Sequence, residues 1–265
     1  MDCYQFIMQY IFLSHDVDWR KQGPPREHVL SRAERFEKDV IENIEFRNPY
    51  YNFSQYMEIE KSFGVRSTFF FRTKYENGNV VDYEDEIQSL IKGGWEIGLH
   101  SDPSSIDDID KIRNEKRLLE NLTNREIVGN RVHYLGFNKD LLQKLQKLGF
   151  SYDSTIKNSK DEIVKEDFGF QIYENLFEFP ITLMDAYMFT HMRIDEEQVL
   201  PTVQKTLAFS KQLNPDFNVI TIIWHDNVLQ MKGGRMYKKI LEFLFNQKDI
   251  KICTGNELVK ILRKL

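Results

Sequence analysis

Short apolar runs alternate with longer helical patterns along the 265 residues of this sequence. The apolar runs, rich in β-branched and aromatic residues, predict strands at 10–14, 65–71, 95–99, 127–132, 150–154, 176–182, 219–224 and 250–253. Helical spacing predicts helices at 34–44, 56–63, 83–91, 104–124, 139–148, 199–212, 234–245 and 257–265. Seven or eight strand–helix units of this kind predict an α/β fold, a (β/α) barrel of parallel strands with outer helices.

No linker, repeat or low-complexity stretch divides the chain, so we expect a single domain over residues 1–265. Hydrophobic residues make up 41% and charged residues 29%, enough to bury a core and keep the surface solvated. The net charge of −5 argues against a protein that binds nucleic acid through phosphate contacts.

The first 19 residues are apolar but carry neither a basic region nor a small-residue cleavage site. Charged residues interrupt this apolar run too soon for a membrane span, so the run predicts the first strand. Because no export signal is visible, we expect a cytoplasmic location. Cys3 and Cys253 lie near opposite ends of the chain and outside any C-x-x-C pattern. We expect two buried or half-buried thiols.

Polar residues with catalytic or metal-binding chemistry follow several of the predicted strands. Reactive residues of parallel barrels lie at the carboxyl ends of the strands, so these side chains are predicted to share one rim. They are His15, Asp16 and Asp18; His100, Ser101 and Asp102; Arg131, His133 and Tyr134; Asp153; and His225 and Asp226. Four of the six histidines fall in this set.

Asp16 and Asp18 would face the same side, about 7 Å apart, if the strand continues through them. That spacing leaves room for a cation and a water, with one carboxylate as ligand and the other as general base. Alternatively, the two acids merely cap a loop, because Asp is common after strands.

His100 suits a zinc-type ligand, with a structural role as the alternative. His225 follows an apolar strand and Trp224, and such partial desolvation suits a general acid or base. Arg131 could orient a carboxylate through its planar guanidinium.

Four segments taken in order resemble the polysaccharide deacetylase superfamily, with its NodB homology fold and carbohydrate esterase family four. They read SHDVDW at 14–19, EIGLHSDPS at 96–104, NRVHYLGF at 130–137 and IIWHDN at 222–227. The segments FSYDSTI at 150–156 and FEFPITLMDA at 177–186 are also similar, in order and spacing. The resemblance spans nearly the whole chain and is closest to a branch with HDVD, GLH, RxHYL and WH signatures.

The resemblance implies a distorted barrel that removes acyl groups from N-acetylated sugars with a bound divalent cation, expected to be zinc. In that family pattern Asp16 matches the catalytic base, and Arg131 the arginine that orients it. Asp18 matches a metal ligand, and His100 the first histidine of the H-[S/T]-x-x-H metal motif. His225 matches the histidine that protonates the leaving amine.

One departure concerns the metal site, because Ser104 stands where the motif has its second histidine. A serine hydroxyl is a poor zinc ligand beside an imidazole. His133 stands where the family usually has proline, so we hypothesise that His133, or else Asp102, supplies the missing ligand. The alternative is that metal binding is weakened or lost.

The leading functional hypothesis is a metal-dependent hydrolase of C–N bonds in linear amides, acting on an acetylated sugar, glycan or sugar nucleotide. One alternative is a barrel that binds a glycan without catalysis, and another is a cyclic amide or imide hydrolase that needs no metal. Segments 155–169 and 185–197 are expected to shape the substrate pocket. The sequence does not specify the oligomeric state.

Overall fold

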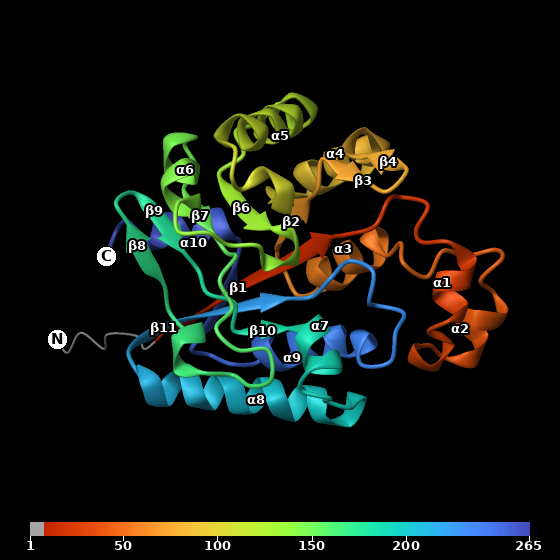
Figure 1. Cartoon of the computed structure of the whole chain (residues 1–265). Coiled ribbons are helices and arrows are strands. Elements are labelled where there is room, and N and C mark those ends of the chain that lie inside the picture. Colours follow the sequence, from red (N-terminus) through yellow and green to blue (C-terminus); the bar gives the residue numbers. More distant parts are fainter. Residues whose placement is uncertain (1–7) are drawn as a thin grey trace.

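The computed structural model describes residues 8–265 and contains a curled, mostly parallel sheet surrounded by helices (Figure 1). Its strands are β1 (Met8–Val17), β2 (Thr68–Phe71), β5 (Glu96–Ser101), β6 (Gly129–Val132), β7 (Tyr152–Asp153), β8 (Gln171–Tyr173), β9 (Leu176–Glu178), β10 (Leu183–Met184), β11 (Phe217–Ile223) and β12 (Ile250–Cys253). They are ordered β10-β11-β1-β2-β5-β6-β7-β9-β8, and β12 also pairs with β1. Only β8 runs antiparallel to its neighbour in this sheet. The predicted distorted barrel with parallel strands and outer helices is confirmed.

Helices lie around the sheet, with α8 and α9 below it and α5 above it in the view of Figure 1. Their bounds are α1 (Arg26–Leu30), α2 (Lys38–Glu42), α3 (Phe53–Ser62), α4 (Glu84–Gly93), α5 (Ile109–Thr123), α6 (Leu141–Lys147), α7 (Asp185–Thr190), α8 (Glu196–Leu213), α9 (Tyr237–Phe245) and α10 (Gly255–Leu262). A small antiparallel hairpin, β3 (Lys74–Tyr75) with β4 (Gly78–Asn79), lies apart from the main sheet.

Two predicted helices differ from the observed ones. The helix expected at 34–44 is interrupted because Phe36 is extended and buried, and pairs with Met231 in an isolated bridge. The helix expected to begin at Ser104 or Ser105 begins instead after Asp108, whose side chain accepts hydrogen bonds from the first turn of α5. Residues 103–105 form a separate 3₁₀ turn, capped by Asp102.

Residues 1–7, and with them Cys3 and the start of the predicted first strand, lie outside the described residues. Cys253 is buried and free, as expected for a packed thiol. None of the described helices is both long and apolar enough to cross a membrane.

β1 is the central strand, with β11 along one edge and β12 followed by β2 along the other. Its side chains alternate between the two faces of the sheet. Leu13 and Val17 belong to the large apolar cluster between the strands and the helices, whereas Phe12 packs with Phe70 and Phe179 inside the barrel. A one-residue change of register along β1 would therefore exchange its two faces.

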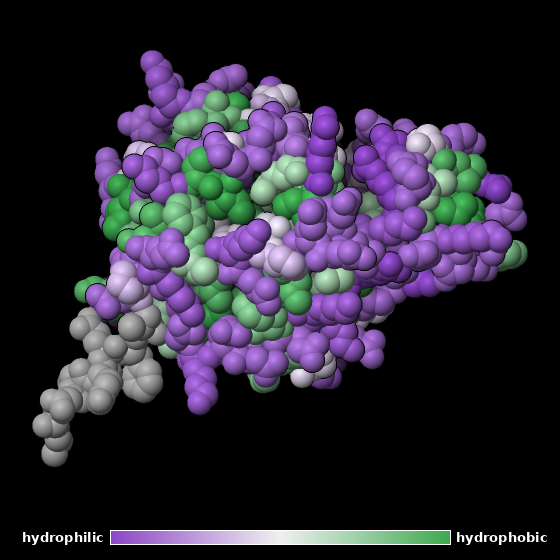
Figure 2. All heavy atoms as spheres, turned by 90° about the horizontal axis from the view of Figure 1, so that it is seen from below, coloured by the Kyte–Doolittle hydropathy of each residue, from purple (hydrophilic) through white to green (hydrophobic). Residues whose placement is uncertain are grey.

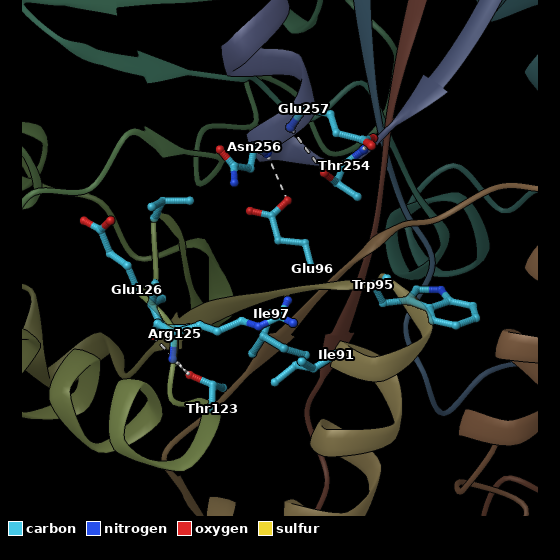
Figure 3. Close-up of a pocket in the computed structure, with 13 residues that line it drawn as sticks. Ile91, Trp95, Glu96, Ile97, Thr123, Arg125, Glu126, Thr254, Asn256 and Glu257 are labelled. Atoms are coloured by element: carbon cyan, nitrogen blue, oxygen red, sulfur yellow. Dashed lines mark hydrogen bonds between the residues drawn. The ribbon is translucent and has the colours of Figure 1, made fainter.

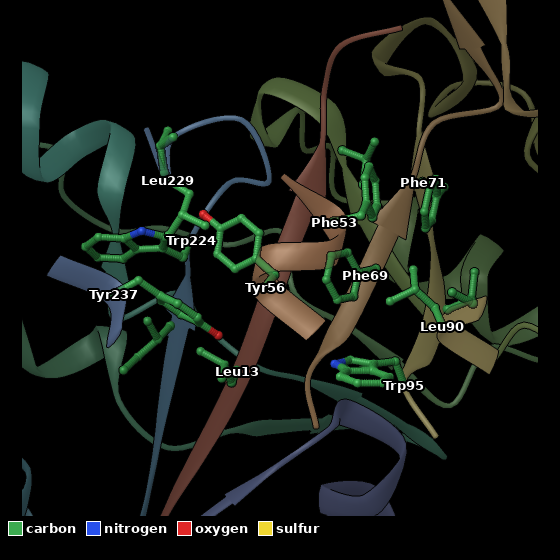
Figure 4. Close-up of a cluster of buried hydrophobic side chains, with 14 of the residues drawn as sticks. Leu13, Phe53, Tyr56, Phe69, Phe71, Leu90, Trp95, Trp224, Leu229 and Tyr237 are labelled. Carbon is green, nitrogen blue, oxygen red and sulfur yellow. The ribbon is translucent and has the colours of Figure 1, made fainter. Parts of the chain in front are cut away.

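The outer cluster consists mainly of large aromatic and aliphatic side chains (Figure 4). Figure 4 shows Phe69 of β2 and Leu13 of β1 between side chains that helices and loops supply. Figure 2, viewed from the side on which α8 lies, shows a mostly hydrophilic surface with smaller apolar patches. The amphipathic helices thus cover the outer face of the sheet with their apolar sides.

A polar network is embedded in this outer cluster and is centred on Glu60 of α3, which is fully buried. Its carboxylate accepts hydrogen bonds from the rings of His15 (2.8 Å) and Trp95 (2.8 Å). The hydroxyl groups of Ser67 and Tyr237 donate to it as well, each at 2.8 Å. One carboxylate therefore joins α3, α9 and the strands, and its charge is compensated by four donors.

Replacing Glu60 by Ala leaves these four donors without their acceptor inside the core. We expect a loss of about 3–5 kcal/mol in the free energy of unfolding, the usual cost of removing one partner of a buried charged pair. Urea denaturation measures this loss, with Glu58→Ala on the exposed side of the same helix as control. Equal denaturation midpoints for the two variants would contradict a stabilising role for the network.

Candidate active site

The predicted rim residues meet at the carboxyl ends of β1, β5, β6 and β11. A cavity of about 380 Å³ is lined there by six of them: Asp16, Asp18, His100, His133, Tyr134 and His225. Arg131 lies fully buried beside this cavity, bound to Asp16. The structure therefore brings together all six residues proposed from the sequence for catalysis and metal binding.

The alternation of side chains explains why these residues converge. Asp16 follows Phe12 by four residues on β1, so its side chain faces the barrel interior as that of Phe12 does. His225 follows the inward-facing Val219 of β11 by six residues, so it lies on the same inward side. His100 follows Gly98 by two residues, and a Cβ at Gly98 would lie 2.5 Å from the ring of Phe70, so both positions face the interior.

His15 differs from the other rim histidines because its side chain faces away from the cavity. Its Nε2 contacts Glu60, and its Nδ1 lies 2.5 Å from the carbonyl oxygen of Trp224, which accepts the hydrogen bond. His15 therefore belongs to the core network. The sequence placed it correctly at this end of the barrel but did not indicate its direction.

Asp18, His100 and His133 form a compact triad of metal-ligand type. Asp18 Oδ1 lies 3.2 Å from His100 Nε2 and 3.2 Å from His133 Nδ1, and the two nitrogens are 3.2 Å apart. Ligand atoms about 2.1 Å from a tetrahedral zinc ion are separated by about 3.4 Å. The spacing of the triad therefore fits a cation of this size.

The hydrogen bonds around the triad also fit a metal site. His100 Nδ1 lies 2.9 Å from the carbonyl oxygen of Arg131, and a proton on Nδ1 leaves the lone pair of Nε2 facing the triad. Asp18 Oδ1 is buried and has no hydrogen-bond partner among the described residues. An acceptor left in this state is costly unless a cation or donor satisfies it.

The pKa values of Asp18 and His133 are both lowered. Burial acts to raise the pKa of Asp18, but the close imidazoles of His100 and His133 hold it well below its usual range. Burial lowers the pKa of His133 despite the neighbouring Asp18. An ionised carboxylate beside a neutral imidazole is the protonation state that metal ligation requires.

Ser104 lies outside the triad, and so does Asp102. The hydroxyl of Ser104 is exposed and donates to Asp102 Oδ1 at 2.7 Å. Asp102 lies near Arg72, with 3.8 Å between their charged atoms. Of the two candidates for the third ligand, the geometry thus favours His133.

Asp16 is held by Arg131, whose Nη1 lies 2.6 Å from Asp16 Oδ1. Burial acts to raise the pKa of Asp16, but Arg131 and two nearby histidines lower it below its usual value. The second oxygen, Oδ2, lies 3.8 Å from His100 Nε2. Asp16 therefore presents an ionised oxygen next to the triad.

His225 is oriented by Asp185, the residue at the start of α7. Asp185 Oδ1 lies 2.6 Å from His225 Nδ1, and its Oδ2 accepts the backbone N–H of His225 at 3.0 Å. Burial opposes the charged imidazole, but Asp185 outweighs it and, with Asp18 and Asp16, raises the pKa of His225 to about 10. Nε2 of the ring faces Asp18 Oδ2 at 3.6 Å.

Sequence reasoning missed the role of Asp185, although it lies within the segment FEFPITLMDA. Asp185 is hard to identify from the sequence because β10, the strand before it, has only two residues and leaves no clear apolar run.

Asp226 is buried beside the site, and burial together with the charge of Asp18 raises its pKa well above the usual range. Asp153 lies deeper in the barrel, where it accepts a hydrogen bond from Asn130 at 2.7 Å.

Tyr134 covers His133 at the mouth of the cavity. It is 84% exposed, and its ring centroid lies 3.8 Å from that of His133. Tyr134 and Leu135 both adopt a positive φ, at 57° and 55°, which is strained for residues other than glycine. This turn places an exposed aromatic ring next to the triad.

A separate cavity of about 200 Å³ lies at the opposite end of the sheet (Figure 3). Glu96 lies at its centre and accepts the backbone N–H of Asn256, at the start of α10, at 2.9 Å. Glu96 precedes His100 by four residues, about 13 Å along a strand. Its carboxylate caps a helix end, and the cavity is distinct from the rim.

We expect His133→Ala to lower the affinity for zinc by more than about tenfold, because even residues that only orient ligands contribute this much. Ser104→Ala should leave the affinity unchanged, since Ser104 lies outside the triad. Elemental analysis after dialysis against limiting zinc compares the two variants. Equal metal content in both would exclude His133 as a ligand.

No family profile and no curated protein matches the chain. A candidate polysaccharide deacetylase from Mycobacterium smegmatis is similar in structure, with a TM-score of 0.69 and 16% identity over 100% of this chain and 93% of that one. PuuE allantoinase is similar with a TM-score of 0.70 and 10% identity over 99% and 92%. A CE4 family pseudoenzyme from Bacillus anthracis has a TM-score of 0.56 and 12% identity over 95% and 66%. The chain thus has the fold of these proteins, and its own site residues must decide the chemistry.

Proposed function

We propose that this protein is a metal-dependent hydrolase that removes the acetyl group from the nitrogen of an acetamido sugar. The observation that carries the proposal is the triangle of Asp18, His100 and His133, with sides of 3.2 Å, between an ionised Asp16 and His225. The structural likeness to a candidate polysaccharide deacetylase supports the sugar substrate.

A divalent cation held by Asp18, His100 and His133 would supply a Lewis acid for the amide carbonyl and lower the pKa of a water. A triad of two imidazoles and one carboxylate is typical of catalytic zinc, which keeps a fourth position open. The buried and unpartnered Asp18 Oδ1 is consistent with this role in the described part of the chain.

Asp16 is suited to accept a proton from the attacking water. Its pKa is lowered, so it is ionised at neutral pH, and Oδ2 is free to face the triad while Oδ1 binds Arg131. Arg131 cannot rotate, because it also donates to the carbonyl and the hydroxyl of Ser154, at 2.8 and 2.9 Å. Arg131 therefore orients the base and takes no proton itself.

His225 is suited to donate a proton to the departing amine. Asp185 accepts the proton of Nδ1 and stabilises the imidazolium, in which Nε2 also carries a proton. The pKa of about 10 keeps the imidazole protonated at neutral pH. This fixed donor and Asp16 both lie beside the triad, so base and acid can act on one amide there.

Asp16→Asn keeps an oxygen acceptor for Arg131 but removes the basic group. We expect kcat for acetyl release to fall by about 10²–10⁴-fold, the usual contribution of a general base. Released acetate is measured with N-acetylglucosamine oligomers, and circular dichroism checks the fold. Asp39→Asn on the exposed α2 is the control, and a fully active Asp16→Asn variant would refute the assignment.

Asp185→Asn removes the charge that holds His225 in place. Without this charge the imidazole loses its main stabilisation as the cation, and a neutral imidazole is a much weaker acid than an imidazolium, so kcat should fall by at least about 10²-fold. KM should change little, because Asp185 is fully buried and does not line the cavity. Steady-state kinetics separate the two constants, and a change in KM alone would contradict the role of Asp185.

Hydrolysis of a cyclic amide is the second candidate, favoured by the likeness to PuuE allantoinase. The same acid and base could open a ring amide. A substrate panel of acetamido sugars and allantoin, tested with and without a chelator, distinguishes the two reactions. Turnover of allantoin alone, insensitive to the chelator, would overturn the proposal of a metal-dependent deacetylase.

A further inference from the structure

The rim cavity continues into a second chamber of about 440 Å³, which we call the basic arm. Asp18 and His225 border both spaces, so the basic arm lies next to the triad. Its far wall comes from α1, from the turn at residues 33–35 and from the loop after β11, which extends toward α1 and α2 in Figure 1. The lining includes three permanently cationic residues: Arg32, Arg35 and Lys232.

Backbone contacts fix these cations relative to one another. The N–H of Lys232 donates to the carbonyl oxygen of Arg35 at 2.7 Å, next to the bridge between Phe36 and Met231. Arg32 lies one turn before Arg35, and its Nη1 donates to the carbonyl oxygen of His28 at 3.2 Å. Two segments almost 200 residues apart in the sequence thus place their charges on one wall.

The cations of the basic arm are poorly neutralised by the protein itself. Within residues 8–265, neither Arg32 nor Lys232 has a carboxylate within 4 Å, and Arg35 has only an exposed contact with Glu34 at 3.9 Å. By contrast, Glu196 in the lining is bound by Arg235 through two hydrogen bonds of 2.7 and 2.8 Å. The lining also holds three carboxylates, Asp18, Asp195 and Glu196, but none of them lies within 4 Å of Arg32, Arg35 or Lys232 in the described residues. The three cations are therefore left to attract an anionic group of a ligand.

Aromatic side chains line the basic arm together with the cations. The ring of Trp19 lies 4.6 Å from that of His28 and 5.5 Å from that of Tyr50. Arg32 and Arg35 are close enough to His28 that, after burial, their charges lower its pKa. Aromatic rings next to guanidinium groups are a common arrangement for binding phosphate esters of sugars.

We propose that the basic arm binds the phosphate of a phosphorylated acetamido sugar, whose acetamide then lies at the triad. This inference rests on the proposed deacetylase function and narrows its substrate to a glycosyl phosphate, in place of a neutral polymer. Guanidinium and ammonium groups match the charge and geometry of phosphate oxygens. The same phosphate occurs in a sugar 1-phosphate and in a nucleotide sugar, and the two are separate arms of the test.

The test compares acetate release from N-acetylglucosamine, its 1-phosphate and its uridine diphosphate ester. We expect the wild-type kcat/KM to be highest for one of the two phosphorylated sugars. In the double variant Arg32→Gln/Lys232→Gln, the preference for that sugar over the neutral one should fall at least about tenfold, mainly through KM. The control Arg26→Gln/Lys38→Gln removes two exposed cations outside the basic arm and should keep the preference.

Calorimetric binding of N-acetylglucosamine 1-phosphate separates the two hypotheses. If no sugar is deacetylated but the 1-phosphate binds the wild type and not the double variant, the deacetylase function fails and the phosphate site stands. If neutral sugars are deacetylated as well as phosphorylated ones and the double variant binds the 1-phosphate like the wild type, the basic arm is overturned alone.

Discussion

The ion pair between Arg131 and Asp16 is the interaction on which the interior of this barrel depends. Arg131 is fully buried, and its donors bind two residues of β1 and the segment after β7. The guanidinium also lies 4.4 Å above the ring of Phe70. Removing one partner of such a pair costs about 3–5 kcal/mol, because the other charge stays buried. The same contact that closes the barrel interior thus fixes the carboxylate proposed as base.

Two adjacent residues of β1 make polar contacts on opposite faces of the sheet. His15 points outward to Glu60, whereas Asp16 points inward to Arg131. The outward network also reaches the site, since His15 contacts the carbonyl oxygen of Trp224 and Tyr56 donates to that of His225 at 2.9 Å. The backbone that carries His225 is therefore held from the core, and its side chain is held by Asp185 from the rim.

Electrostatics differ sharply between the centre of the site and its surroundings. Around the triad, carboxylates and histidines compensate one another, so the pKa of Asp18 is low and that of His225 is high. In the basic arm, neither Arg32 nor Lys232 has a carboxylate within 4 Å among the described residues. A substrate with a neutral acetamide and a negatively charged group would complement both regions.

The sequence by itself determined the order of strands and helices, and the end of the barrel at which the reactive residues lie. Apolar runs such as 219–224 and the polar residues directly after them carry that information locally, because parallel strands must bring their carboxyl ends together. The helix at 34–44 was predicted wrongly, since burial of Phe36 against Met231 interrupts it. The direction of His15, the pairing of Asp185 with His225 and the separation of Ser104 from the triad were decided by the tertiary structure. So was the meeting of Arg35 with Lys232, because only folding joins segments that lie so far apart in the chain.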